Sequence, residues 1–271
     1  MPPPDAVYTH GHHDSVLRSH RWRTAENSAA YLLDHLAPGL RLLDVGCGPG
    51  TITIDLAARV APGPTVGVDA DHGVLARAAE AAAAAGVDVS FRTGDAYALD
   101  AEDASFDVVH AHQVLQHLGD PVAALSEMRR VCAPGGVVAA RDADYAAMTW
   151  APAEPALDRW LALYRELARL NGGEPDAGRH LLAWARRAGF PDVRPGASVW
   201  CFATPEDRRW WAETWATRVT ESSLAVQAVD RGLASGPDLA ALAEGWLRWA
   251  SSPDGWFTVL HGEVVCPAPA A

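Results

Sequence analysis

The chain has few cysteines and no closely spaced pair of them. Cys47, Cys132, Cys201 and Cys266 lie far apart, and the sequence contains no Cys-x-x-Cys motif. Neither a zinc-ribbon site nor a dense disulfide framework fits this spacing, so we expect a reducing, cytoplasmic setting. Repeats of solenoid period are also absent, which excludes a stacked-repeat architecture.

Long apolar runs and an excess of basic charge are missing as well. No run approaches the ~18 residues that a membrane helix needs, and the segment 1–5 lacks the basic region of a secretion signal. The 22 basic against 34 acidic residues give a net charge of −12, which repels polyphosphates and anionic lipid headgroups. We therefore expect a soluble protein of the cytoplasm, with neither nucleic acid nor a membrane as its partner.

The sequence does contain an alternation of short β-rich runs with amphipathic helical ones. With 271 residues, 49% of them hydrophobic, it can form one main domain plus an elaboration. The runs typical of strands are 41–45, 65–69, 87–91, 106–110 and 136–140. The runs typical of helices are 28–36, 53–60, 73–85 and 121–131. This alternation predicts a Rossmann-like α/β fold with a parallel sheet covered by helices on both faces.

The second half of the chain is mostly helical and holds every tryptophan except Trp22. Two further strands are predicted at 197–202 and 256–265, on either side of a helical insert at 205–250 that is broken near Gly232 and Gly236. They complete a seven-stranded, mostly parallel sheet with a C-terminal helical insert. The tryptophans either fill the core between insert and sheet or form the aromatic wall of a substrate pocket.

A glycine-rich turn follows the first predicted strand. The segment 42–51, LLDVGCGPGT, lets the backbone turn sharply and lets a ligand approach main-chain N–H groups. Asp69 ends the second strand, where a carboxylate can accept hydrogen bonds from a ribose, and Gly94-Asp95-Ala96 follows the third, where an acidic loop can contact adenine. A turn without a ligand and a dehydrogenase site are the alternatives, but a dehydrogenase would place its third glycine at Thr51.

These motifs, in this order, closely resemble the class I S-adenosylmethionine-dependent methyltransferases, in particular the subgroup with the ubiquinone and menaquinone C-methyltransferases. The resemblance covers residues 28–145 and includes the later elements 106–109 and 131–137. It implies S-adenosylmethionine as the cofactor. It also implies cofactor contacts, which we assign to Asp44, Gly46, Gly48 and Gly50 for the methionine portion, Asp69 and Ala70 for the ribose, Gly94, Asp95 and Ala96 for adenine, and His110 and Tyr8 near the sulfonium.

Histidines follow the fourth predicted strand, at the sheet edge where ligands bind. His117 is the first candidate for a general base, because Val-Leu-x-His-Leu matches a Val-Leu-His-His-Leu region of related enzymes. Gln116 stands at the other histidine position of that region, which puts a two-histidine site in doubt. His112 is the second candidate, and for both residues a role in capping or orienting the loop is an equal alternative.

Residues after the fifth strand and near the N-terminus are the candidates for binding the methyl acceptor. We predict contacts from Asp142, Asp144, Tyr145, Trp150 and Arg21. The two aspartates could instead orient a histidine, pair with Arg141 or bind a metal with His110 or His112, although no oxygen-rich metal site is evident and none is expected. Residues 1–27 are predicted to form an arm or a helical lid over the cofactor.

We therefore expect one methyltransferase domain over residues 1–271, with the arm or lid at 1–27, the cofactor-binding core at 28–145 and the helical cap with the last strands at 146–271. The expected reaction moves a methyl group to an O, N or C nucleophile, for example a carboxylate or phenolate, of a small hydrophobic metabolite in secondary metabolism. A peptide or protein acceptor and a non-catalytic cofactor-binding protein are the alternatives, and a monomer or homodimer is expected.

Overall fold

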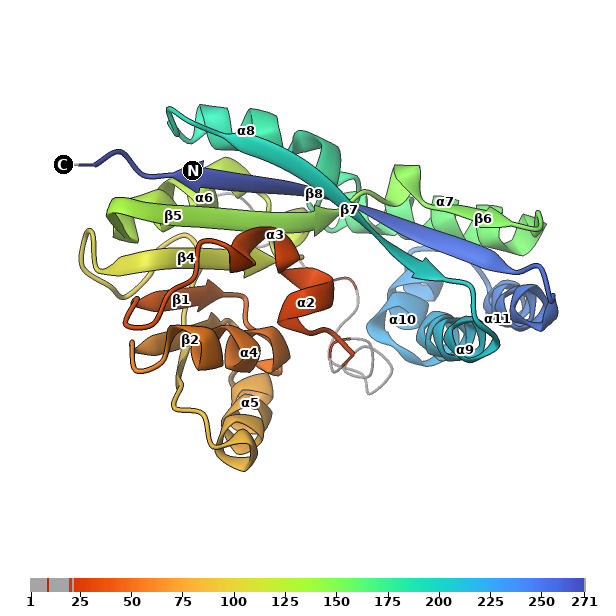
Figure 1. Ribbon diagram of the computed structural model, residues 1–271. Coiled ribbons are helices and arrows are strands. Elements are labelled where there is room, and N and C mark those ends of the chain that lie inside the picture. Colours follow the sequence, from red (N-terminus) through yellow and green to blue (C-terminus); the bar gives the residue numbers. More distant parts are fainter. Residues whose placement is uncertain (1–8, 10–19, 21, 271) are drawn as a thin grey trace.

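The computed structural model describes Thr9, His20 and residues 22–270 (Figure 1). Within these residues the centre is one eight-stranded sheet in the order β3-β2-β1-β4-β5-β8-β6, with β7 also paired to β8. The strands are β1 (Leu42–Val45), β2 (Thr65–Asp69), β3 (Ser90–Thr93), β4 (Phe106–His112), β5 (Cys132–Ala143), β6 (Thr149–Ala151), β7 (Arg194–Phe202) and β8 (Trp256–Pro267).

The first five strands pair in parallel, which confirms the prediction from the alternation of strands and helices. The connecting helices are α4 (Thr51–Val60), α5 (His72–Ala85) and α6 (Pro121–Val131). Asp71 begins α5 by accepting hydrogen bonds from backbone N–H groups of its first turn, and Asp120 begins α6 in the same way. The carboxyl ends of β1, β4 and β5 consequently meet at one edge, which faces the helical half of the chain (Figure 1).

The sheet has one strand more than predicted. β8 runs antiparallel to β5 and β7, and the three-residue β6 pairs with β8 beyond the end of β5. The predicted strands 197–202 and 256–265 are confirmed with longer bounds. β6 escapes prediction because a three-residue strand is too short to show an alternating pattern.

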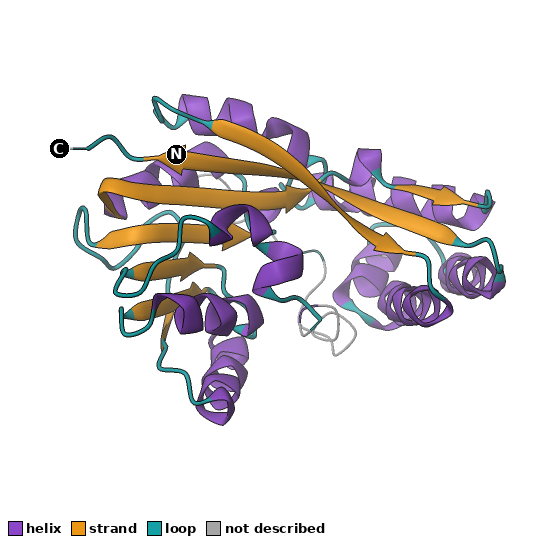
Figure 2. Cartoon of the chain, viewed as in Figure 1, coloured by secondary structure: helices purple, strands orange, loops and turns teal. Residues whose placement is uncertain are grey.

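Most helices of the second half gather at the end of the sheet where β7 and β8 project beyond β5 (Figure 2). They are α7 (Pro155–Leu170), α9 (Pro205–Glu221), α10 (Ser223–Asp230) and α11 (Gly236–Ser251). The short helix α8 (Leu181–Arg187) instead packs against α6 and β8 (Figure 1). The ring of Trp160 lies 4.4 Å from that of Trp215 and 4.7 Å from that of Trp246, measured between centroids. These rings are buried, so the interpretation of the tryptophans as core is confirmed here.

The chain enters the sheet through two short helices, α2 (Ala25–Ser28) and α3 (Ala30–Leu33). The prediction of one helix at 28–36 is wrong in its extent, because Thr24 and Asn27 form a capping box that starts the helix earlier and Ala29 leaves helical geometry. Three one-turn 3-10 helices, η1 (Leu115–His117), η2 (Tyr145–Ala147) and η3 (Ala177–His180), complete the described elements. None of the described helices is long and apolar enough to cross a membrane.

Candidate functional site

A cavity of about 410 Å³ lies at the carboxyl ends of the parallel strands. One end of it is formed by the turn after β1 and the segments after β2 and β3, and the other by β7, α9 and the loop after β5. The predicted site residues that line it are Asp44, Gly46, Gly48, Asp69, Ala70, Gly94, Asp95, Ala96, His112, His117 and Tyr145. Most of the predicted cofactor residues are thus brought together in one place.

The turn after β1 is shaped by glycines in the left-handed region. Gly46, with φ +68°, is packed so closely that an added Cβ would lie 2.3 Å from Val114 Cγ2. Gly48, with φ +53°, has open space instead, because the nearest atom to an added Cβ is His20 Nδ1 at 3.8 Å. Gly50 starts α4 and faces Ala78 and Phe91, outside the cavity lining. The turn therefore offers its backbone to a ligand at Gly48, while Gly46 and Gly50 serve packing.

Asp69 is held at the end of β2 by two backbone donors. Its Oδ2 accepts a hydrogen bond from Gly48 N at 2.9 Å and its Oδ1 accepts one from Asp71 N at 3.0 Å. The carboxylate is fixed beside the glycine turn and lines the cavity. Carboxylate oxygens have further lone pairs for ligand hydroxyls, so this geometry fits a ribose.

The segment after β3 completes this end of the cavity. Asp95 Oδ1 accepts a hydrogen bond from Tyr97 N at 2.9 Å, which fixes the turn. Gly94 packs so tightly on Val68 that an added Cβ would lie 2.7 Å from Val68 Cγ1. Gly94 and Ala96 are small, so they leave a slot for a planar ring beside the acidic side chain of Asp95. An open glycine cradle, a fixed carboxylate and this slot fit the parts of S-adenosylmethionine.

His110 lies beneath the cavity rather than in its wall. Its Nδ1 is 2.7 Å from Asp44 Oδ1, and Thr53 Oγ1 donates to the other oxygen of the same carboxylate. Both His110 and Asp44 are buried. The structure thus makes His110 a partner that fixes Asp44, and it is Asp44 that reaches the cavity.

His112 and His117 line the cavity at the end of β4, between the glycine turn on β1 and the aromatic residues on β7. Burial, aided by the charge of Arg23, lowers the pKa of His117 to about 3 and that of His112 well below its ordinary value. Gln116 Nε2 lies 3.1 Å from His117 Nε2, so the amide donates and the imidazole accepts. Both ring nitrogens of His112 are buried without a hydrogen-bond partner among the described residues.

The other end of the cavity is aromatic. Its apolar lining is Trp22, Tyr145, Met148, Trp200, Trp210, Trp211, Trp215 and Val259. Trp22 comes from the N-terminal side and packs edge-on against Trp200 at 5.2 Å between ring centroids. Trp200, Trp211 and Trp215 belong both to the core cluster and to the cavity wall, so the two interpretations of the tryptophans do not exclude each other, and their role in binding a substrate stays a prediction.

Two arginines line this aromatic end, and the sequence analysis missed both. Arg23 donates from Nη2 to Gln113 Oε1 at 2.7 Å. Arg218 is only 4% exposed, and its guanidinium carbon lies 4.5 Å from the ring centroid of Trp215. A signal for Arg218 was present, because it follows Trp211 and Trp215 at helical spacing and so falls on the buried stripe of α9.

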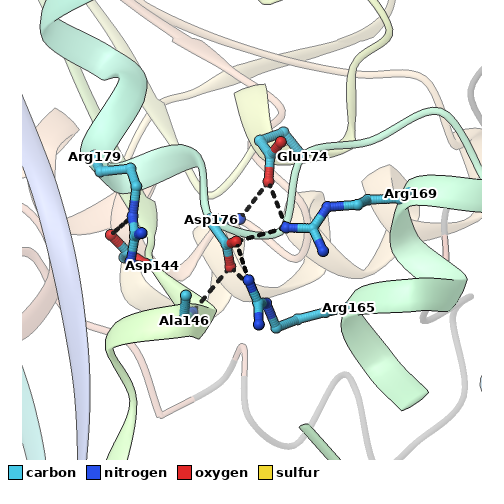
Figure 3. Close-up of polar contacts among 7 residues, drawn as sticks. All are labelled: Asp144, Ala146, Arg165, Arg169, Glu174, Asp176 and Arg179. Carbon is cyan, nitrogen blue, oxygen red and sulfur yellow. Dashed lines mark hydrogen bonds and ion pairs between the residues drawn. The ribbon is translucent and has the colours of Figure 1, made fainter. Parts of the chain in front are cut away.

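Two predicted acceptor-binding residues lie outside the cavity wall. Asp144 accepts hydrogen bonds from Arg179 Nε and Nη2, both at 2.7 Å, and sits next to an ionic cluster around Asp176 (Figure 3). The ring of Trp150 stacks on Phe257 at 5.6 Å between centroids. In place of a ligand contact, the Asp144 pair ties the loop after β5 to η3, and Trp150 anchors β6 to β8.

Asp142 is also absent from the cavity wall. It is fully buried under η1, where its Oδ1 accepts a hydrogen bond from Gln116 N at 3.1 Å. Burial raises the pKa of this carboxyl to about 7. The predicted Tyr8 and Arg21 lie outside the described residues. Among the described residues no group of three or more His, Cys, Asp or Glu side chains could hold a metal ion.

Comparison with known proteins places this chain in a family. The family model described as "Methyltransferase domain" matches residues 36–188. A protein of Schizosaccharomyces pombe named "Uncharacterized methyltransferase" is 37% identical over 276 residues, which cover 97% of this chain and 97% of that protein. A "Probable methyltransferase ltbC" of Aspergillus luteorubrus is 30% identical and covers 95% of this chain and 96% of that protein.

Solved structures share the fold at lower identity. The YcgJ protein of Bacillus subtilis has a TM-score of 0.56 at 19% identity and covers 90% of this chain and 98% of that chain. A phosphoethanolamine N-methyltransferase of Haemonchus contortus, solved with S-adenosylhomocysteine, has a TM-score of 0.56 at 21% identity and covers 89% of this chain and 52% of that chain. The chain belongs to the methyltransferase domain family, and it is a methyltransferase with S-adenosylmethionine as its cofactor.

Proposed function

We propose that this methyltransferase acts on a small, largely apolar acceptor that binds in the aromatic end of the cavity. The observation that carries this proposal is that the glycine turn, the acidic residues and the aromatic wall line one continuous cavity. A ligand at the glycine end and a ligand at the aromatic end would therefore meet inside it. Alignment of a nucleophile with an activated methyl group is the main requirement of methyl transfer.

The residues at the glycine end would hold the cofactor, which supplies a methyl group on a positively charged sulfur. Gly48, whose own N–H group donates to Asp69, would let the cofactor approach the backbone of the turn closely, and Asp44, held by His110, would bind a cationic group. Asp69, with Ala70, would accept hydrogen bonds from the ribose, and Asp95 would accept one from adenine. Gly46, Gly50 and Gly94 would keep the backbone in place.

His112 and His117 would contact the acceptor as neutral hydrogen-bonding groups. An imidazole whose pKa lies near 3 accepts a proton poorly at neutral pH, because its charged form is strongly disfavoured. The buried Oε1 of Gln116 has no partner among the described residues and could accept a hydrogen bond from an acceptor hydroxyl. If the histidines stay neutral, kcat should not change between pH 6 and 9. A fall of kcat below about pH 6.5 that is lost in His117→Gln would instead show that His117 is a general base.

The aromatic end also favours a small molecule over a peptide. It combines Trp22 from the N-terminal segment with Trp200 on β7 and Trp210 on α9, and the Trp22 ring packs against both of the others. A peptide would need an open groove, in which these rings would not be in contact with one another. The proposed acceptor is therefore a small metabolite, and its place in secondary metabolism and in the cytoplasm is part of this proposal.

The proposal is tested by screening small aromatic and aliphatic metabolites, and in parallel an unfolded protein mixture, with the full chain and labelled S-adenosylmethionine. Release of S-adenosylhomocysteine with a small molecule is expected. Label found only in protein would contradict the small-molecule assignment, and cofactor binding without turnover on any acceptor would support the non-catalytic alternative. Asp88→Ala, an exposed carboxylate away from the cavity, is the matched control for cofactor-site variants.

A further inference from the structure

Two neutral side chains at the end of β4 bring unpaired polar atoms to the cavity wall. His112 is the last residue of β4, Gln116 belongs to η1, and they are 6% and 3% exposed. Both line the cavity. Among the described residues, neither ring nitrogen of His112 has a hydrogen-bond partner, and the Oε1 atom of Gln116 has none. Unpaired buried polar atoms are costly, so a ligand that pairs with them is favoured.

The Gln116 amide is held in place by its neighbours. Its backbone N–H donates to Asp142 Oδ1 at 3.1 Å, and its backbone oxygen accepts from Glu174 N at 2.9 Å. Gly173 packs so closely there that an added Cβ would lie 2.6 Å from Gln116 O. The side-chain Nε2 donates to His117 Nε2 at 3.1 Å, which leaves Oε1 for a ligand. This oxygen is therefore in position before a ligand binds.

His112 presents an uncharged ring. It packs beside Trp200 and His261, with 5.8 Å and 6.2 Å between the ring centroids. Burial, aided by the charges of Arg23 and Arg141, lowers the pKa of His112 well below its ordinary value. A neutral imidazole has one N–H donor and one nitrogen that accepts, so His112 can bind a group that does both.

The unpaired atoms define what the ligand must offer. Gln116 Oε1 and the unprotonated nitrogen of His112 each need a donor, whereas the N–H group of His112 needs an acceptor. A hydroxyl group supplies both. A carbonyl or ether oxygen only accepts, so it would leave the two acceptors unpaired, and an anionic oxygen would in addition be repelled by their lone pairs.

The wall gives no support to a cationic donor. The four carboxylates in it, Asp44, Asp69, Asp71 and Asp95, all come from the glycine end, and no carboxylate lines the aromatic end within the part of the chain that the structure describes. A buried ammonium group without a counter-charge is costly. An uncharged amine that is to be methylated needs its single lone pair for the methyl group, so it could not also accept from His112.

We propose that the methyl acceptor is an uncharged, largely apolar molecule that carries a hydroxyl group, and that His112 and Gln116 select it through this group. The inference rests on the proposed function and names the acceptor class for the same cavity. The hydroxyl hydrogen points to one of the two acceptors and the hydroxyl oxygen accepts from His112. The apolar body lies against the aromatic residues of β7 and α9.

The test is a binding comparison on the full chain saturated with S-adenosylhomocysteine. Calorimetry at about pH 7, where 1-naphthol is uncharged, compares it with 1-methylnaphthalene and 1-naphthoate, which share its ring system. We expect 1-naphthol to bind about 10- to 100-fold more tightly than 1-methylnaphthalene, because it pairs the buried polar atoms. The anion 1-naphthoate should bind less tightly than 1-naphthol.

Three variants assign this preference to the two side chains. Gln116→Met and His112→Phe keep similar shapes but remove the hydrogen-bonding atoms. Each should lower the preference for 1-naphthol over 1-methylnaphthalene at least about threefold, and the double variant should reduce it to within about twofold. The control His35→Phe replaces an exposed histidine outside the cavity and should leave the preference unchanged.

Equal binding of 1-naphthol and 1-methylnaphthalene, tighter binding of 1-naphthoate, or no binding of any probe to the saturated protein would overturn the inference. An unchanged preference in the folded double variant would overturn it as well. The comparison on the unaltered chain stands even if a variant fails to fold. Failure of S-adenosylhomocysteine itself to bind would instead overturn the proposed function, so the two failures are distinguishable.

Discussion

Replacement of Asp69 by alanine tests the assignment of the cofactor end most sharply. The Asp69 carboxylate accepts hydrogen bonds from Gly48 N and Asp71 N and lines the cavity, so it both shapes the turn and faces the ligand. The alanine side chain can do neither. We expect S-adenosylhomocysteine to bind more weakly, with a small loss of stability from the two backbone donors.

The magnitude follows from the bonds that are lost. Hydrogen bonds to a charged group contribute about 1.5–3 kcal/mol each, but exposed backbone donors recover part of this from water. A net loss of about 1–3 kcal/mol in binding corresponds to a dissociation constant about 5- to 150-fold higher. The loss of unfolding free energy should be at most about 2 kcal/mol, because the Gly48 and Asp71 donors are only partly buried.

The assay is calorimetric titration of the variant with S-adenosylhomocysteine at a temperature where urea unfolding shows it to be folded. Asp88→Ala removes the same charge from an exposed loop and should bind as the unaltered chain does. If Asp69→Ala binds the cofactor product with unchanged affinity, the assignment of this carboxylate to the ribose is refuted, and with it the placement of the cofactor along β2.

Three further outcomes are expected. Gly48→Ala should raise the dissociation constant of S-adenosylhomocysteine about tenfold by calorimetry, because the added Cβ would occupy open cavity space at a residue with φ +53°. The control Gly86→Ala, at φ +68° outside the cavity, should lower stability but leave this affinity unchanged. The free energy of unfolding from urea titrations should fall as the pH drops from about 6.5 toward 3, because the unfolded chain binds a proton that folded His117 does not. The fall should reach about 1.4 kcal/mol per pH unit for each histidine held neutral, and an unchanged slope in His117→Asn would contradict this. Trp246→Ala should cost about 3–5 kcal/mol in unfolding free energy, because the ring is fully buried against Trp160, and a cost below 1 kcal/mol would refute its place in the core.

The parallel half of the fold could be predicted because its signals are local. Period-two apolar runs, glycines after β1 and the caps at Asp71 and Asp120 each act within a few residues of the element they define. The helix at 121–131 agrees with α6 to the residue. By contrast, β6 depends on pairing with β8 about a hundred residues away, which no local pattern reveals.

The site could be predicted where its chemistry belongs to one turn, and not where it depends on contacts across the fold. The cavity collects Gly48, Asp69 and Asp95 from motifs that are visible in the sequence. The pairing of Asp144 with Arg179 cannot be read from sequence spacing, because η3 reaches that loop only after α7 has turned back. Arg218 was detectable in principle as a charge on an otherwise buried helical stripe.

The central claim is that the glycine end of the cavity holds S-adenosylmethionine. Calorimetric titration of the full chain with S-adenosylmethionine and S-adenosylhomocysteine, with and without a chelator, tests it most directly. The account predicts one site per chain with micromolar affinity for both compounds, unaffected by the chelator and weakened in Asp69→Ala. No binding of either compound, or binding of NAD in their place, would contradict it.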